Sequence, residues 1–393
     1  MMVSELARPW RSIALLCAVA ALCACATEGG HQARLSAKQI TTEMLLDASP
    51  LMMGLDVEDR SQVDVLELSP EMIAFVDENT RDNDGSDANL RSLLRAVMGT
   101  DTFKLIYDDK TRTARETFED RQGNCLSFTN MFVAMARQAG IDARYQEVEI
   151  APLWSLVGHS FLLNQHINVA VNLKSGAVQV IDFNITNFGG SNDTRVISDR
   201  RARAHYFNNI GAEEMLGGDT QSSFANFRQS VLEDGTFSPG WVNLGNLYRR
   251  DGYSEYAEAA YLHALETDDG NVVAMSNLAS LYQEQGHEEL AEQYRERVEF
   301  HRMRNPYYLF LLATETSVSG DYGAAIKYMK RAIRLRDDEP RFYALLSYCY
   351  LMRGEDEKAR YWMGKAEAAA VGLNEKRRYQ DKLDLLMRMN SGN

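Results

Sequence analysis

The chain has 393 residues, of which 45% are hydrophobic and 25% are charged. These fractions are typical of folded globular proteins and exclude disordered, collagen-like and low-complexity chains. The formal net charge of −14 argues against nucleic acid or anionic lipid as a main partner, because both require a basic surface. At about 100–200 residues per domain, we expect two or three domains.

The five cysteines are unevenly placed. Three of them lie in the first 25 residues, and the remainder of the chain holds only Cys125 and Cys349. This distribution excludes a disulfide-stapled scaffold and a zinc site built on paired CxxC motifs. The sequence also contains no Walker loop, no HExxH motif and no GxGxxG opening a βαβ unit. No metal, nucleotide or other cofactor is therefore implied.

Residues 1–24 have the pattern of an export signal. Arg8 and Arg11 precede an apolar stretch at 13–22 that is too short to span a bilayer. The sequence Leu-Cys-Ala-Cys at 22–25 then resembles a bacterial lipobox. The resemblance implies cleavage before Cys25 and lipidation of its thiol, with residues 25–45 as a tether.

A lipid anchor at Cys25 predicts a protein of the bacterial cell envelope that faces the periplasm. Because Ala26 follows the anchor where Asp would favour retention in the inner membrane, the outer membrane is the expected location. The alternative is an ordinary secretory signal, cleaved at a site such as Ala21 or Ala24.

The second half of the chain repeats with a period of 34 residues. The register is set by small and large apolar residues in the window 238–271, namely Trp241, Leu244, Gly245, Tyr248, Ala257, Tyr261 and Ala264. The pattern recurs in the windows 272–305, 306–339 and 340–373, and a weaker copy covers 204–237. It resembles the tetratricopeptide repeat, which implies pairs of antiparallel helices that stack into a solenoid. We expect residues 374–393 to form a capping helix.

A solenoid of this kind implies a groove that binds a protein or a peptide. Asn243 and Asn277 occupy the sixth position of two successive windows, a position that contacts the bound chain in some relatives. The alternative is that asparagine is simply common at this position.

Cys125 is the candidate nucleophile of the middle region. Asn124 is a favourable N-cap, an apolar stretch follows from Leu126 to Ala139, and Gly140 is a favourable C-terminal stop. The pattern predicts a helix that begins at Cys125, where the helix dipole would stabilise a thiolate. Phe128, Phe132 and Met135 predict that one face of this helix lies in the core, and a strand should follow at 141–148. The alternative is a buried and inert cysteine.

A hairpin downstream supplies the candidate base and its orienting group. Residues 161–173 and 177–183 alternate as strands around a Lys-Ser-Gly turn, which fits a type I turn with a G1 bulge. This turn places Asp182 opposite Asn168, with His166 one diagonal step away on the same face. His159 is the alternative, but it has the wrong parity and would lie about 30 Å along a continuous strand. Cys125, His166 and Asp182 then form a nucleophile, a base and an orienting carboxylate.

Four sequence segments around these residues resemble the transglutaminase-like superfamily. They are Gly-Asn-Cys-Leu-Ser-Phe at 123–128, Ala-Gly-Ile-Asp-Ala-Arg at 139–144, Gln-His-Ile-Asn-Val-Ala-Val at 165–171 and Val-Ile-Asp-Phe-Asn at 180–184. The resemblance covers roughly residues 90–190 and implies an α+β, papain-like domain, which we expect to span 46–200 with a helical subdomain at 46–90. It implies the roles already given to Cys125, His166 and Asp182. Asn168 departs from the aromatic residue that is frequent two places after the histidine.

Two functions are compatible with these features. The first is a cysteine-dependent enzyme of acyl transfer at the cell envelope, which hydrolyses or transamidates an amide through Cys125, His166 and Asp182. The second is an inactive transglutaminase-like and repeat scaffold for protein–protein interaction. Backbone amides at the start of the Cys125 helix could bind an oxyanion, but the sequence does not identify a second donor.

Overall fold

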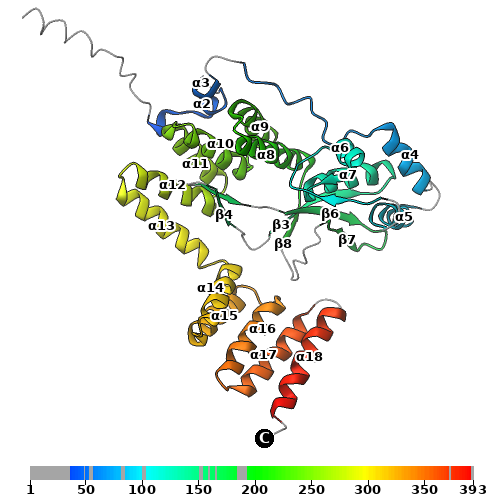
Figure 1. Cartoon of the computed structure of the whole chain (residues 1–393), viewed down its shortest axis with the longest axis vertical. Helices are drawn as coiled ribbons and strands as arrows, with labels where there is room; N and C mark the ends of the chain where they lie inside the picture. Colours follow the sequence, from blue (N-terminus) through cyan, green and yellow to red (C-terminus); the bar gives the residue numbers. More distant parts are fainter. Residues whose placement is uncertain are drawn as a thin grey trace, which may run out of the picture.

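The computed structural model describes the chain from Ser36 to Asn390 with internal gaps (Figure 1). The described residues are 36–47, 49–52, 56–80, 85–99, 103–149, 154–157, 160–163, 166–183, 193–370 and 373–390. A mixed α/β region is followed by a long series of helices, which is the fold class predicted from the sequence. Among the helices in these ranges, none combines the length and the hydropathy that a membrane span requires.

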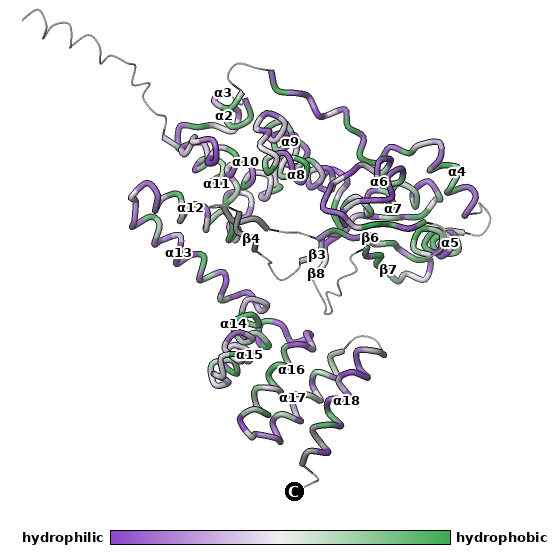
Figure 2. Tube along the Cα trace, viewed as in Figure 1, coloured by the Kyte–Doolittle hydropathy of each residue, from purple (hydrophilic) through white to green (hydrophobic). Residues whose placement is uncertain are grey.

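The α/β region is built around a four-stranded sheet in the order β7-β6-β3-β8. Helices α4 to α7 belong to the same region, together with the short parallel pair β1–β2. The bounds are α4 Pro70–Asn79, α5 Ser86–Met98, β1 Ile106–Tyr107, α6 Ala114–Asp120, β2 Gln122–Gly123, α7 Cys125–Gln138, β3 Ala143–Glu149, β6 His166–Asn172, β7 Val178–Ile181 and β8 Asp193–Val196. Figure 2 shows the apolar residues gathered along the sheet and the helices that pack on it.

The β6–β7 hairpin has the predicted register. Val169 pairs with Ile181 and Ala170 with Val180, and Gly176 has a φ of 82°, as a G1 bulge requires. The prediction of one continuous strand over 161–173 was wrong, because β5 (Ser160–Leu163) and β6 belong to different sheets. Strand β5 pairs instead with β4 (Trp154–Val157), and this second hairpin lies against α10 and α12 of the repeat region.

Helix α7 is the centre of the α/β core. Asn124 is its N-cap, Cys125 is its first residue, and Gly140 ends it in the left-handed region at φ 72°. All three features were predicted. The expectation of a single core face was too narrow, because every residue from Leu126 to Ala136 is buried.

The repeat region consists of paired helices. Helices α10, α12, α14 and α16 begin 34 residues apart, at Ser238, Val272, Pro306 and Pro340. The bounds are α8 Asp199–Gly217, α9 Thr220–Glu233, α10 Ser238–Arg250, α11 Ser254–Thr267, α12 Val272–Glu284, α13 Glu288–Arg302, α14 Pro306–Val318, α15 Tyr322–Leu335, α16 Pro340–Met352, α17 Asp356–Ala369 and α18 Leu373–Asn390. The apolar core of the repeats is divided at the step from α13 to α14, since one cluster ends at Val298 and the next begins at Tyr307.

Helix α8 belongs to two cores. Ala202, Tyr206 and Phe207 lie in the apolar cluster of the α/β region. Ala212 and Met215, further along the same helix, pack against the first cluster of the repeats. The α/β region and the first repeats are therefore joined by a shared helix and not by a linker.

The first described residues pack on the repeats. The segment contains η1 (Ala37–Gln39), α2 (Thr42–Leu46) and α3 (Ser49–Met52), whose apolar side chains join the core cluster of α9 to α13. The Tyr248 and Tyr253 hydroxyls donate to the carbonyls of Leu45 and Pro50, each at 2.7 Å. The structure thus differs from the expected division of the chain, in which 25–45 is a tether and 46–52 begin the α/β domain.

Candidate active site

The N-terminus of α7 is held by a side-chain cap. The Asn124 side-chain oxygen accepts from the backbone N–H of Ser127 at 3.0 Å and from its hydroxyl at 3.0 Å. This bond satisfies one of the free amides that every helix end presents. Cys125 is half-buried and is a free thiol at the first position of the helix. The positive end of the helix dipole lies at this place.

The segment before α6 surrounds this cap. The backbone N–H of Arg112 donates to Ser127 Oγ at 2.9 Å, and the carbonyl of Lys110 lies 3.2 Å from the same oxygen, as a second acceptor for its one proton. The amide nitrogen of Asn124 donates to Thr111 Oγ1 at 2.7 Å. Thr111, Asn124 and Ser127 are all buried, so water does not compete for these bonds. The sequence analysis assigns no role to Thr111 or to Ser127, although Ser127 lies in the Gly-Asn-Cys-Leu-Ser-Phe segment at 123–128.

The structure brings Cys125, His166 and Asp182 together. His166 Nε2 lies 2.8 Å from both carboxylate oxygens of Asp182, and the same imidazole hydrogen-bonds with the Cys125 thiol. Because Asp182 occupies Nε2, Nδ1 is the nitrogen left for the sulfur. The His166 side chain is 4% exposed, whereas Asp182 is 37% exposed.

The charge of the site is set by these contacts. Burial alone would lower the pKa of His166, but its hydrogen bonds to Asp182 and with Cys125 outweigh burial and raise this pKa to about 9. The imidazole is therefore protonated at neutral pH and can stabilise a thiolate on Cys125.

Asn168 has a defined place beside this group. Its side-chain amide donates to Asp182 Oδ2 at 3.3 Å, across the hairpin whose register the turn predicts. The residue that departs from the family pattern thus holds the orienting carboxylate. His159, the alternative base, lies outside the described residues, as does Cys25. Strands β5 and β6 belong to different sheets, so the length of one continuous strand does not rule out His159. The choice of His166 rests on its contacts with Asp182 and Cys125.

Asn243 and Asn277 are buried in a ladder of asparagines. Asn243 donates to Asn208 at 2.9 Å, Asn246 donates to Asn243 at 3.3 Å, and Asn277 donates to Asn246 at 2.9 Å. This arrangement favours a packing role between α8, α10 and α12 over contact with a bound chain.

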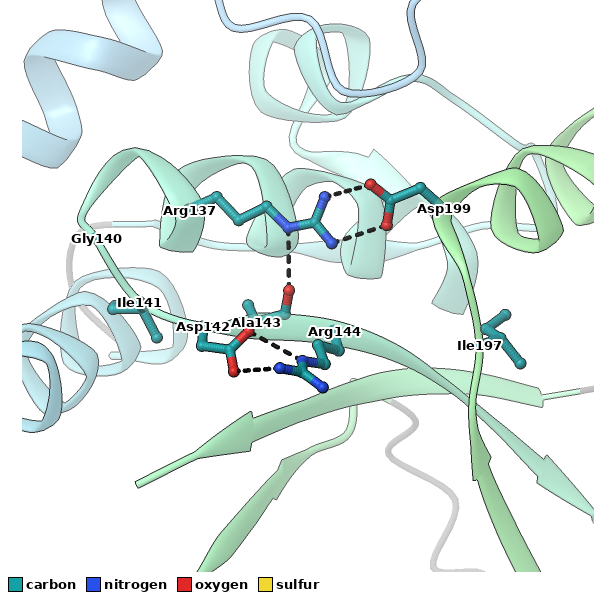
Figure 3. A pocket seen from close by; sticks show the side chains of 8 residues that line it. All are labelled: Arg137, Gly140, Ile141, Asp142, Ala143, Arg144, Ile197 and Asp199. Atoms are coloured by element: carbon teal, nitrogen blue, oxygen red, sulfur yellow. Dashed lines mark hydrogen bonds and ion pairs between the residues drawn. The ribbon is translucent and has the colours of Figure 1, made fainter. Parts of the chain in front are cut away.

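A shallow polar pocket lies away from the thiol, at the other end of α7 (Figure 3). Its arginines are already paired, since Arg137 binds both carboxylate oxygens of Asp199 and Arg144 binds both of Asp142. Within the described residues, no three His, Cys, Asp or Glu side chains are grouped to hold a metal ion.

Comparisons with known proteins agree with an α/β region that is followed by helical repeats. Residues 76–172 match the family model of the transglutaminase-like superfamily, and residues 238–271 match a tetratricopeptide repeat. The first match includes Cys125 and His166 and ends before Asp182. No curated relative matches the chain.

Similar solved structures cover about half of the chain or slightly less. The MamA protein is 17% identical over 42% of this chain and 91% of its own, with a TM-score of 0.24. PilF of Pseudomonas aeruginosa is 16% identical over 50% and 96%, with a TM-score of 0.26. YrrB, a TPR protein with an unusual peptide-binding site, is 14% identical over 45% and 92%, with a TM-score of 0.24. Scores this low carry no functional argument. From the two family matches, the chain contains a transglutaminase-like core domain and tetratricopeptide repeats.

Proposed function

We propose that the protein is a cysteine-dependent enzyme that transfers the acyl group of an amide. The observation that supports this most strongly is the contact of one imidazole, His166, with both Asp182 and the Cys125 thiol at the start of a buried helix. A scaffold has no physical need for a protonated, buried histidine beside a free thiol, since burial of a charge is costly unless it is paired.

The reaction follows from the roles of these groups. The Cys125 thiolate attacks the amide carbonyl, and the tetrahedral oxyanion is stabilised by amides at the N-terminus of α7. His166 gives its proton to the leaving nitrogen as the C–N bond breaks, and an acyl thioester remains on Cys125. Neutral His166 then takes a proton from water or from an amine, which attacks the thioester and releases the acid or the new amide. Asp182 keeps the imidazole oriented in both steps.

The repeats are the part of the protein that we expect to bind a protein or peptide partner. Stacked helix pairs present extended surfaces of this type. The buried ladder of Asn243 and Asn277 takes these residues out of the binding surface, and β5 covers part of α10 and α12. A partner would therefore meet other side chains of the repeats.

We also propose that Cys25 anchors the protein in the cell envelope, facing the periplasm and more favourably in the outer membrane than in the inner one. The support is the lipobox-like sequence at 22–25. Incorporation of a radiolabelled fatty acid into the wild-type chain, and its absence from a Cys25→Ala variant, would test this.

The enzymatic proposal is tested by capturing the acyl-enzyme. The wild-type protein is incubated with cell-envelope extract, quenched in acid, and digested, and the mass added to the Cys125 peptide identifies the acyl group. A Cys125→Ser variant is the control. Iodoacetamide should also label Cys125 faster than Cys349, because burial raises the pKa of the Cys349 thiol to about 11. Equal labelling of the two thiols would overturn the proposal.

The scaffold function gives a different outcome in cells. If Cys125→Ala restored a deletion strain fully while deletion of α14 to α18 did not, binding and not catalysis would be the function. Loss of rescue by Cys125→Ala, with unchanged protein level, supports the enzyme.

A further inference from the structure

Glu213 connects the first helix of the repeat region to the cap of the nucleophile helix. It lies near the end of α8, and its Oε1 accepts from the backbone N–H of Thr111 at 2.8 Å. The Thr111 side chain also hydrogen-bonds with this carboxylate, and Thr111 Oγ1 accepts from Asn124 at 2.7 Å. A continuous chain of hydrogen bonds therefore runs from α8 to the residue that precedes Cys125.

The number of protons available fixes which group donates in each hydrogen bond between Glu213, Thr111 and Asn124. A hydroxyl has one proton, so a Thr111 hydroxyl that donates to Glu213 must accept from the Asn124 amide. With its nitrogen turned toward Thr111, Asn124 presents its oxygen to Ser127, as the 3.0 Å bond to the Ser127 amide requires. A carboxylate, which only accepts, is well suited to impose this order.

A second contact joins α7 and α8 at the opposite ends of the two helices. Arg137, near the end of α7, binds Asp199, the first residue of α8, with the two terminal nitrogens of its guanidinium group (Figure 3). Glu213, near the other end of α8, reaches the start of α7 through Thr111. The two helices thus run in opposite directions, and both span about 20 Å between these contacts at 1.5 Å per residue.

We propose that Glu213 is a positioning residue for the Cys125 nucleophile, which acts through Thr111 and Asn124. The proposal rests on the proposed function, because it assigns Glu213 to the support of the same thiol. It also places an essential part of the catalytic unit outside the transglutaminase-like match, which ends at residue 172. The first helix of the repeat region then completes the enzyme as well as beginning the solenoid.

The test compares Glu213→Ala, Glu213→Gln and Glu214→Ala in the full chain. Glu214 is the matched control, since it is the neighbouring half-buried carboxylate of α8 but accepts from Asn226 of α9 at 2.8 Å. Iodoacetamide labelling of Cys125 is followed against pH, together with amide hydrogen exchange of residues 108–113 and 124–128. Glu213→Ala should slow labelling at neutral pH about fivefold, the effect of a lost helix cap, and should speed exchange in both segments.

Glu213→Gln should stay within about twofold of wild type, because its amide oxygen can still accept from Thr111. Glu214→Ala should leave labelling and exchange in both segments unchanged. Equal behaviour of Glu213→Ala and Glu214→Ala in both measurements would overturn the proposal. If wild-type Cys125 labels no faster than Cys349, the enzymatic function fails, and the exchange of residues 108–113 and 124–128 still decides whether Glu213 positions the cap.

Discussion

The helix pairs α8–α9 and α10–α11 are built alike and placed differently. In each pair a glycine of the first helix faces an aromatic ring of the second. A Cβ on Gly211 would lie 2.7 Å from the Phe227 ring, and one on Gly245 would lie 2.6 Å from the Tyr261 ring. Helix α10 packs in the repeat core, whereas α8 also contributes to the core of the α/β region. A repeat unit can therefore serve a neighbouring domain while it keeps its internal packing.

Polar side chains also join α8 to the α/β region. Glu147 of β3 binds Arg201 at 2.9 Å and His205 at 2.7 Å, both on α8, and Arg201 continues to Asp234 at 3.1 Å. Burial would raise the pKa of Glu147, but hydrogen bonds from His205, Arg195 and Arg201 lower it well below its ordinary value. Burial lowers the pKa of His205, so at neutral pH it donates to Glu147 as a neutral imidazole.

The largest effect is expected from a substitution that removes Glu147 from its contacts with Arg201 and His205. Glu147→Ala leaves Arg201 and His205 buried without their shared acceptor, and should reduce the free energy of unfolding by about 3–5 kcal/mol. Arg195→Ala is the control, because that side chain is 67% exposed and its loss should cost less than about 1 kcal/mol. Urea denaturation measures both. Similar losses in the two variants would show that α8 is not held to the sheet by buried charge.

A pH titration tests whether the stability of α8 depends on the protonation of His166. The pKa of His166 is raised to about 9 from an ordinary value of 6.5. Its contribution to stability is therefore complete below pH 6.5 and is lost as the pH rises through 9, to a total of up to about 3 kcal/mol. Hydrogen-exchange protection factors, which correct for the intrinsic rise of the exchange rate with pH, should fall in α7 and α8 over this interval and should change little in α10.

The matched variant in the titration is Asp182→Asn, which removes the charged partner of His166. Its stability should change less between pH 6.5 and 9 than that of the wild type, because the pKa of His166 returns toward its ordinary value. Acyl transfer by the wild type should also fall above pH 9, where His166 has no proton for the leaving group. A wild-type stability that rises over this interval would contradict the assignment.

The sequence predicts what depends on local or strictly periodic signals. The cap at Asn124, the stop at Gly140, the register around Gly176 and the 34-residue spacing of the helices are all present in the structure. The break between β5 and β6 was missed, because alternation alone does not distinguish one strand from two.

The role of α8 could not be predicted for a different reason. The contacts of Glu213 with Thr111 and of Glu147 with Arg201 join residues that are far apart in the sequence. No spacing rule connects such residues, and their pairing depends on how the two regions pack. The repeat pattern at 204–237 is weaker than in the later windows, and α8 in this window contributes side chains to two cores.

Substitutions at Gly211 and Gly245 test whether the helix pairs α8–α9 and α10–α11 are packed equally tightly. Gly211→Ala and Gly245→Ala should each reduce the free energy of unfolding by about 1–3 kcal/mol, because the new methyl group overlaps an aromatic ring. Gly217→Ala in α8 is the control, with no atom within 4 Å of the added Cβ, and should stabilise the helix by about 0.5–1 kcal/mol. Thermal or urea unfolding measures all three. A loss at Gly245 without one at Gly211 would mean that the α8–α9 pair has relaxed the small-residue requirement.

The smallest effect is expected at Asp199, the first residue of α8. Asp199→Asn removes the charge that pairs with Arg137, but this pair is at the surface, with side chains 35% and 50% exposed. Its loss should therefore cost about 0.5–1 kcal/mol, including the interaction of Asp199 with the N-terminus of its helix, and the cost should shrink in high salt. Arg144→Ala breaks a comparable pair with Asp142 that joins no second helix, so it should cost less. A loss of 3 kcal/mol or more in Asp199→Asn would mean that the Arg137 contact, and not the buried cluster of Glu147, is what holds α8 to the α/β region.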